Sequence, residues 1–219
     1  MKIGIKDFLY QIRFFLIPYL ILLAICLIIK LNFTKDEIYY TVNTRHSDWA
    51  DFIAPYVTDI GDGLTTIALS AILLLFSYRK AFLLASTYAI TSILAQVIKH
   101  IFDAPRPKLY FANHLKGIYF IKGVNILSFH SFPSGHTVTA FSTAIVILYF
   151  LKNKQWGLLL LLVAACVGYS RMYLSEHFFE DVTIGSIIGV VVTIPWLIWI
   201  DNKQFLHTAK WNKGLLKNS

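Results

Sequence analysis

The sequence is poor in cysteine, proline and acidic residues. Its 219 residues include two cysteines, six prolines and twelve aspartates and glutamates. Two cysteines cannot build the disulfide framework of a small secreted domain, and both lie inside apolar runs, where packing is their ordinary role. The prolines and glycines form no linker, and we find no internal repeat and no separate soluble domain. We therefore expect a single membrane-embedded domain over residues 1–219.

Apolar residues are the abundant class and make up 57% of the chain, more than the core of a soluble domain of this size uses. They gather in blocks close to the length of about 17–25 residues that crosses the hydrocarbon of a bilayer, and these blocks lack polar stripes. We expect the first block to be a retained span, because its apolar stretch is longer than that of a signal peptide. The pattern predicts an all-α integral membrane bundle of six transmembrane helices, at approximately 14–31, 63–78, 83–101, 134–151, 156–170 and 181–200.

The distribution of charge predicts the orientation of this bundle. With six spans, both termini share one side with short turns at 79–82 and 152–155, and this side collects lysines and arginines against only two aspartates. By the positive-inside rule, both termini are cytoplasmic. The net charge of +8 is therefore a topology signal. We expect no nucleic-acid partner, because no long basic run with interleaved aromatics occurs. The opposite face receives three segments: 32–62, 102–133 and 171–180.

Polar and charged residues gather at one end of the last four predicted spans. The alternating direction of an antiparallel bundle brings these ends to the same membrane face. Charged groups at such depth are costly and usually mark a function. The residues in question are Lys99, Arg106, Ser134, Gly135, His136, Arg171, His177 and Asp181.

The chemistry of these residues points to a phosphoryl group. Two arginines and a lysine can surround an oxyanion, and Ser134 opens a helix whose free N–H groups favour an anion. His177 and Asp181 are four residues apart and share a helix face. Asp181 can then accept the Nδ1 proton and leave Nε2 free as a nucleophile. His136 can donate a proton to the leaving oxygen.

Three short motifs carry a family resemblance. "KHIFDAPRP" (99–107), "PSGH" (133–136) and "SRMYLSEHFFED" (170–181) resemble the three-part signature of the type 2 phosphatidic acid phosphatase superfamily. That signature reads K-x6-R-P, P-S-G-H and S-R-x5-H-x3-D, and the sequence matches every position and spacing. The signature region, 99–181, spans the last four predicted helices. One such motif is weak, whereas three in order are specific.

The resemblance implies a role for each matched position. His177 would form a phosphohistidine, Asp181 would orient it, and His136 would act first as acid and then as base. The family works without a metal, so we expect no cofactor. Its core is a six-helix bundle, and its membrane members act on lipid phosphates or diphosphates. The residues that would bind the phosphoryl group are Lys99, Arg106, Ser134, Gly135 and Arg171.

Two hypotheses from other classes remain open. A metal hydrolase would bind zinc or a related ion through three histidines and an aspartate, although three nearby cations would repel the ion. A non-enzymatic carrier would move an anion or a lipid, but it leaves the paired histidine and aspartate without a role. The metal ligands would be His130, His136, His177 and Asp181.

Some neighbouring residues have ordinary structural interpretations. Glu176 and Glu180 flank the proposed nucleophile, and we expect both to be solvated acids at a helix start. Gly185 and Gly189 are four residues apart in the last span. We expect them to allow close packing within the bundle rather than to form a dimer seam.

The favoured substrate is undecaprenyl diphosphate. Its diphosphate would use several cations, and its tail needs an entrance from the membrane. The resemblance implies lipid A, phosphatidic acid and phosphatidylglycerophosphate as alternatives, because members of the family act on these lipids too. The compact chain favours a bacterial inner-membrane enzyme with a site that faces the periplasm. The segment 108–132 predicts nothing about substrate, and the sequence predicts no oligomeric state.

Overall fold

The computed structural model describes residues 3–114 and 117–216. Every regular element in these residues is a helix, which confirms the all-α prediction. The α-helices are α1 (Ile5–Gln11), α2 (Arg13–Asn32), α3 (Lys35–Asn43), α4 (Asp48–Asp59), α5 (Gly63–Phe76), α6 (Tyr78–Phe102), α7 (Pro107–Tyr110), α8 (Gly135–Phe150), α9 (Trp156–Tyr173), α10 (Phe179–Asp201) and α11 (Ala209–Asn212). Two 3₁₀ helices, η1 (Ala112–His114) and η2 (Gln204–His207), complete the order.

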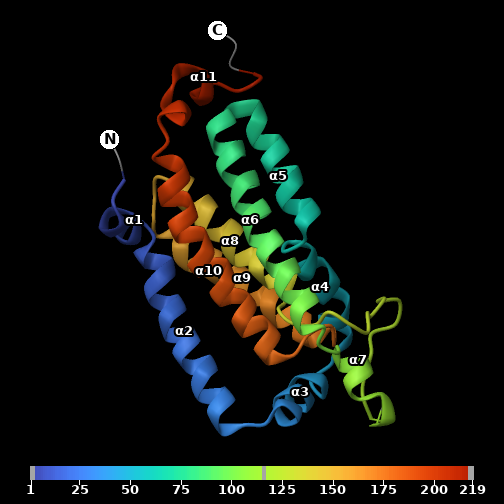
Figure 1. The fold of residues 1–219 in the computed structure, drawn as a ribbon. Helices are drawn as coiled ribbons and strands as arrows, with labels where there is room; N and C mark the ends of the chain where they lie inside the picture. The colour runs from blue at the N-terminus through green and yellow to red at the C-terminus, as the bar shows by residue number, and fades with distance from the viewer. Residues whose placement is uncertain (1–2, 115–116, 217–219) are drawn as a thin grey trace.

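Helix α8 forms the centre of the bundle. It packs against α5, α6, α9 and α10, and α2 packs along α9 (Figure 1). A Cβ atom added at Gly185 would lie 2.8 Å from the carbonyl oxygen of Ser134, and one added at Gly189 would lie 2.8 Å from that of Val138. The two glycines therefore let α10 approach the backbone of α8, which is the packing that we expected within the bundle.

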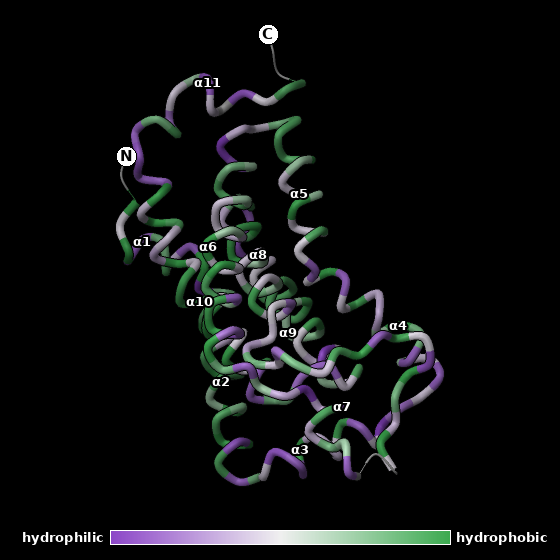
Figure 2. Tube along the Cα trace, turned by 45° about the vertical axis from the view of Figure 1, so that its right-hand side comes forward, coloured by the Kyte–Doolittle hydropathy of each residue, from purple (hydrophilic) through white to green (hydrophobic). Residues whose placement is uncertain are grey.

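Helices occupy all six predicted spans. By length and composition, α2, α6, α9 and α10 can each cross a membrane. Helix α5 reaches that length only together with α4, from which it is bent by 52°, and α8 is a shorter apolar helix of 16 residues. Figure 2 shows apolar residues along the helices of the bundle and hydrophilic stretches near its ends. The described chain is thus an apolar helical bundle compatible with a membrane.

The predicted turn at 79–82 is wrong. The break between α5 and α6 lies instead at Ser77, where the backbone is extended and the side chain caps α6 by accepting the N–H of Lys80. Arg79 therefore lies in the first turn of α6, where its guanidinium donates to Asp201 at 2.8 and 2.5 Å. The prediction places the turn at Arg79 and Lys80 because these two basic residues interrupt the apolar pattern. The start of the helix is set instead by the Ser77 cap.

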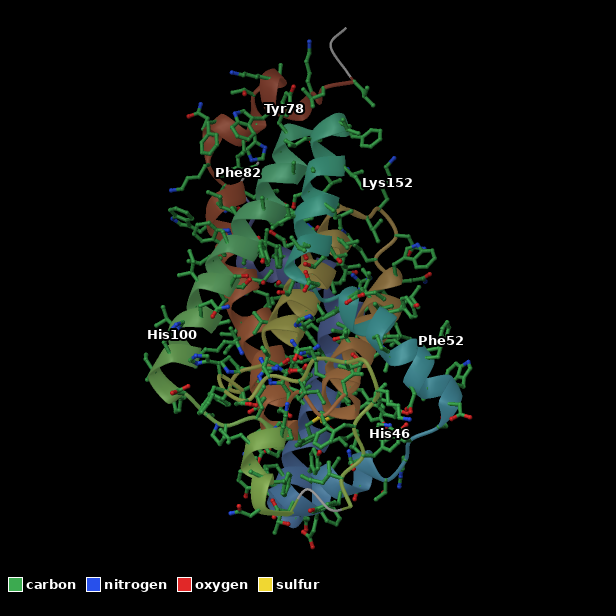
Figure 3. The ribbon with its side chains drawn as sticks, turned by 90° about the vertical axis from the view of Figure 1, so that its right-hand side faces the viewer. His46, Phe52, Tyr78, Phe82, His100 and Lys152 are labelled. Atoms are coloured by element: carbon green, nitrogen blue, oxygen red, sulfur yellow. The ribbon has the colours of Figure 1, made fainter. Side chains whose placement is uncertain are left out.

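The two ends of the bundle differ in what they carry. Both termini lie toward one end with α11, whereas α3 and α7 lie at the other end (Figure 1). Figure 3 shows Tyr78 and Lys152 toward the first end and His46 and His100 in the half that carries α3 and α7. The residues of the sequence signature occupy this second half, at the α7 end of α6 and α8.

Two helices that the sequence did not predict, α3 and α4, support this end. Thr34 and Glu37 form a capping box that starts α3. At its other end, buried Asn43 donates to the carbonyl oxygen of Tyr119 at 2.8 Å and accepts the N–H of Tyr119 at 3.0 Å. The same Asn43 amide donates to Ser175 Oγ at 3.1 Å. One side chain therefore ties the loop after α7 to the turn between α9 and α10.

Candidate active site

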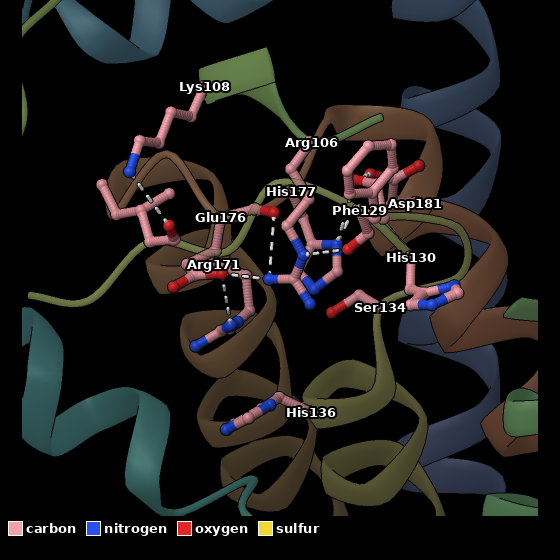
Figure 4. Close-up of polar contacts among 12 residues, drawn as sticks. Arg106, Lys108, Phe129, His130, Ser134, His136, Arg171, Glu176, His177 and Asp181 are labelled. Atoms are coloured by element: carbon pink, nitrogen blue, oxygen red, sulfur yellow. Dashed lines mark hydrogen bonds and ion pairs between the residues drawn. The ribbon is translucent and has the colours of Figure 1, made fainter. Parts of the chain in front are cut away.

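The eight signature residues meet at one end of the bundle. Figure 4 labels Arg106, Ser134, His136, Arg171, His177 and Asp181 among them. Each lies at or next to a helix terminus, because α6, α8, α9 and α10 all begin or end there. Lys99 lies in the last turn of α6, and Arg106 and Ser134 directly precede α7 and α8 at the N-cap position. Gly135 and His136 begin α8, Arg171 lies in the last turn of α9, His177 lies in the turn between α9 and α10, and Asp181 lies in the first turn of α10.

His177 is 1% exposed, and its Nδ1 lies 3.5 Å from Asp181 Oδ2. A third residue stands beside this pair. Ser131 Oγ donates to Asp181 Oδ2 at 2.5 Å and lies 3.5 Å from His177 Nδ1. The N–H of Phe178 donates to the same aspartate oxygen at 2.9 Å. Asp181 is thereby held in place, and Ser131 can link it to the imidazole.

The pKa of His177 lies well below its ordinary value, because burial disfavours the charged ring and three neighbouring cations repel it. Those cations are Arg171, Arg106 and Lys99. The imidazole is therefore neutral at physiological pH. A neutral ring with Nδ1 directed to a carboxylate keeps a lone pair on Nε2, which is the form that a nucleophile needs.

The three cations are buried. Lys99 Nζ donates to the carbonyl oxygen of His130 at 2.6 Å, and Arg106 Nε donates to that of Phe129 at 2.9 Å. Arg171 Nη1 donates to Thr58 Oγ1 at 2.9 Å, but its buried Nε has no acceptor among the described residues. Buried cations with donor capacity left over fit an anion such as a phosphoryl group.

The expectation that Glu176 is solvated is wrong. The residue is 5% exposed, and its carboxylate pairs with the guanidinium groups of both Arg106 and Arg171. The backbone explains the burial, since Ser175 has a positive φ of 57° and the N–H of Glu176 donates to the carbonyl of Arg171 at 3.0 Å. This turn directs the acid inward. Glu180 instead pairs with Lys30 at the protein surface.

His136 has a carboxylate partner that the sequence did not reveal. Its Nε2 lies 3.4 Å from Asp62 Oδ2, and Asp62 also caps α5 by accepting the N–H of Leu64. Figure 4 shows the His136 ring set apart from that of His177. A cavity of about 170 Å³ lies beside His136, between α5, α6 and α8. The two histidines therefore approach the site from different sides.

The four residues of the metal hypothesis do not gather around one point. The His130 ring faces Asp103 at 3.1 Å, His136 faces Asp62, and His177 faces Asp181. No group of three potential ligands that could hold a metal ion occurs in residues 3–114 and 117–216. The described residues thus offer paired contacts rather than the four-ligand set of a zinc site.

Comparisons with known proteins agree with the motifs. Phosphatidylglycerophosphatase B of Bacillus subtilis is 30% identical over 159 residues, which cover 63% of this chain and 72% of that relative. An undecaprenyl-diphosphatase of Sulfolobus acidocaldarius is 25% identical over 155 residues, which cover 70% of this chain and 72% of that relative. Across the curated relatives, the match spans between 20% and 72% of the relative's own length.

A solved structure shares the fold as well. The crystal structure of Aquifex aeolicus LpxE aligns with a TM-score of 0.64 at 28% identity, over 74% of this chain and 93% of that chain. Residues 80–205, more than half of the chain, match the PAP2 superfamily. That range contains all eight signature residues. The motifs, the fold and the match over this range agree, and the chain belongs to the PAP2 superfamily.

Proposed function

We propose that this PAP2 enzyme hydrolyses the phosphate or diphosphate headgroup of a membrane lipid through a phosphohistidine on His177. One observation carries the proposal. A buried neutral histidine, held near a carboxylate, lies among three buried cations at one end of an apolar bundle. The relatives named as phosphatidylglycerophosphatase and undecaprenyl-diphosphatase support a lipid phosphate as substrate.

In the first step, His177 Nε2 attacks phosphorus. The nitrogen–phosphorus bond forms while the bond from phosphorus to the leaving oxygen breaks, and His136 gives its proton to that oxygen. The leaving oxygen is the ester oxygen of the lipid in a monophosphate and the bridging oxygen of the departing lipid monophosphate in a diphosphate. The Asp181 carboxylate stabilises the positive charge that develops on the imidazole. The cations and the N–H groups at the start of α8 stabilise the phosphoryl oxygens, which carry the negative charge of the transition state.

In the second step, water replaces histidine on phosphorus. His136, now neutral, takes a proton from the attacking water, and the nitrogen–phosphorus bond breaks. Inorganic phosphate leaves, and His136 is protonated again for the next cycle. Asp62, at 3.4 Å from His136 Nε2, can balance the positive charge of the protonated ring. No step needs a metal or another cofactor.

We further propose six spans in a bacterial inner membrane, with α4 and α5 forming one bent span and α8 another. Both termini would then be cytoplasmic and the site would face the periplasm. The excess of lysines and arginines at the end with the termini supports this orientation. The whole chain, 1–219, would form one membrane-embedded domain.

Undecaprenyl diphosphate is the substrate that we favour. Three cations suit a diphosphate, and the long isoprenoid tail suits a site at the end of an apolar bundle. Lipid A, phosphatidic acid and phosphatidylglycerophosphate stay as alternatives with the same reacting group. An anion or lipid carrier is the alternative from another class, and the pairing of His177 with Asp181 speaks against it.

The experiment is phosphate release by the detergent-purified protein, with and without a chelator. The panel holds undecaprenyl diphosphate, lipid A, phosphatidic acid and phosphatidylglycerophosphate. We expect release from undecaprenyl diphosphate that the chelator does not change. Release that the chelator abolishes would favour the metal hydrolase, and no release from any lipid would favour the carrier.

A further inference from the structure

Glu176 contacts the two arginines that the proposed function assigns to phosphate. It directly precedes His177, yet its carboxylate turns away from solvent and pairs with both Arg106 and Arg171. Arg106 Nη1 also reaches the backbone oxygen of Glu176 at 3.4 Å. A carboxylate and a phosphoryl group use the same planar donors of arginine. Both anions therefore compete for the same guanidinium groups.

The charges of the buried groups show the consequence of this contact. The buried side chains of Lys99, Arg106 and Arg171 contribute three positive charges, and the carboxylates of Glu176 and Asp181 contribute two negative ones. Without Glu176, the pocket would hold one more unbalanced positive charge. Buried charges without a partner are costly. The carboxylate thus stabilises the arginines in the free protein, and it weakens their attraction for an incoming anion.

We propose that Glu176 is a built-in competitor for the phosphate site, which lowers the affinity of the pocket for phosphate. The incoming phosphoryl group displaces the carboxylate from the arginines, and the carboxylate returns to them when inorganic phosphate leaves. This inference rests on the proposed function for the identity of the pocket. Its consequence is faster release of a product that three cations would otherwise hold tightly.

The test is the binding of inorganic phosphate to the detergent-purified full chain, followed by calorimetry. Glu176→Gln keeps the size of the side chain and removes its charge. We expect the Kd for inorganic phosphate to fall about tenfold, the scale of one hydrogen bond to a charged group. Glu180→Gln is the matched control, because this acid pairs with Lys30 and not with the arginines. Its Kd should equal that of the unaltered protein.

The direction in which the Kd for inorganic phosphate changes shows whether Glu176 competes with phosphate or only orients the arginines. If Glu176 only orients the arginines, Glu176→Gln will raise the Kd or leave it unchanged, and either result overturns the proposal. Should that variant fail to fold, Glu176→Asp decides, since its shorter side chain keeps the charge but withdraws it from the two arginines. A lowered Kd in Glu176→Asp supports competition, whereas an unchanged or raised Kd refutes it.

Binding and turnover separate the two proposals. If Glu176→Gln binds phosphate more tightly but the unaltered protein hydrolyses no lipid, competition stands and the phosphatase proposal fails. If lipids are hydrolysed but Glu176→Gln binds phosphate no more tightly, only the competition is refuted. In an active enzyme, inorganic phosphate should also inhibit Glu176→Gln at about tenfold lower concentration than it inhibits the unaltered protein.

Discussion

Ser131 offers a sharp test of how His177 is positioned. This serine is fully buried, and it lies outside the signature motifs. Its Oγ donates to Asp181 Oδ2 at 2.5 Å and stands 3.5 Å from His177 Nδ1. Ser131 Oγ can accept a hydrogen bond from Nδ1–H of His177 while its own O–H donates to the carboxylate of Asp181. Ser131→Ala removes this link and leaves the cations in place.

The expected loss follows from the strength of a hydrogen bond to a charged group, about 1.5–3 kcal/mol. If this energy orients the nucleophile in the transition state, kcat falls roughly 10- to 150-fold. KM should change little, because among the described residues Ser131 forms no hydrogen bond with Lys99, Arg106 or Arg171, so the binding of phosphate does not depend on it. Steady-state phosphate release in detergent micelles measures both constants.

Ser142→Ala is the matched control for this change. Ser142 is equally buried, but its Oγ donates to the carbonyl of Thr139 inside α8 at 3.0 Å. We expect its kcat to stay within about twofold of the unaltered enzyme, since no group of the site is involved. A Ser131→Ala enzyme with unchanged kcat, or one that loses phosphate binding in parallel with kcat, would refute the positioning role.

Other consequences concern the second histidine, pH and packing. Asp62→Asn should lower kcat about tenfold while inorganic phosphate still binds, because the protonated His136 loses its counter-charge; unchanged kcat would remove Asp62 from the mechanism. The pKa of His177 is depressed in the folded protein, so as pH falls the unfolded chain takes up a proton on this ring first, near pH 6.5. Protonation of the unfolded chain lowers the free energy of unfolding, so the stability associated with the neutral ring is present above that pH and is lost as pH falls below it. Thermal unfolding at pH 7.5 and 5.5 should therefore show a smaller pH effect in His177→Gln than in the unaltered protein, and an equal effect would contradict this. Gly189→Val should destabilise the bundle by about 1–3 kcal/mol, because the added atoms would overlap α8; unfolding in denaturing detergent measures it, and an unchanged transition would contradict the packing.

Hydropathy and motif spacing could predict the helical bundle and the gathering of eight residues at one end. Both depend on short-range patterns, because an apolar block of sufficient length becomes a helix and consecutive spans alternate in direction. The break at Ser77 was not predictable from hydropathy alone. It depends on a side-chain cap and on Asp201, which neutralises Arg79 from the far end of the chain.

The partners of the site residues were harder to predict than the residues themselves. Asp62 meets His136 only because the bend between α4 and α5 brings that turn beside the start of α8. Burial of Glu176 depends on the left-handed backbone of Ser175, which no periodicity signals. Such contacts are set by tertiary packing, and a single sequence contains no pattern for them.

The formation of a phosphohistidine on His177 is the central claim, and trapping it is the most direct test. The purified enzyme would be mixed with a lipid that carries a ³²P-labelled terminal phosphate and quenched in alkali within milliseconds, with His177→Gln in parallel. The mechanism predicts an acid-labile, alkali-stable label on the peptide that contains His177, and neither label nor turnover in the variant. Turnover by His177→Gln, or a label on another residue, would contradict the mechanism.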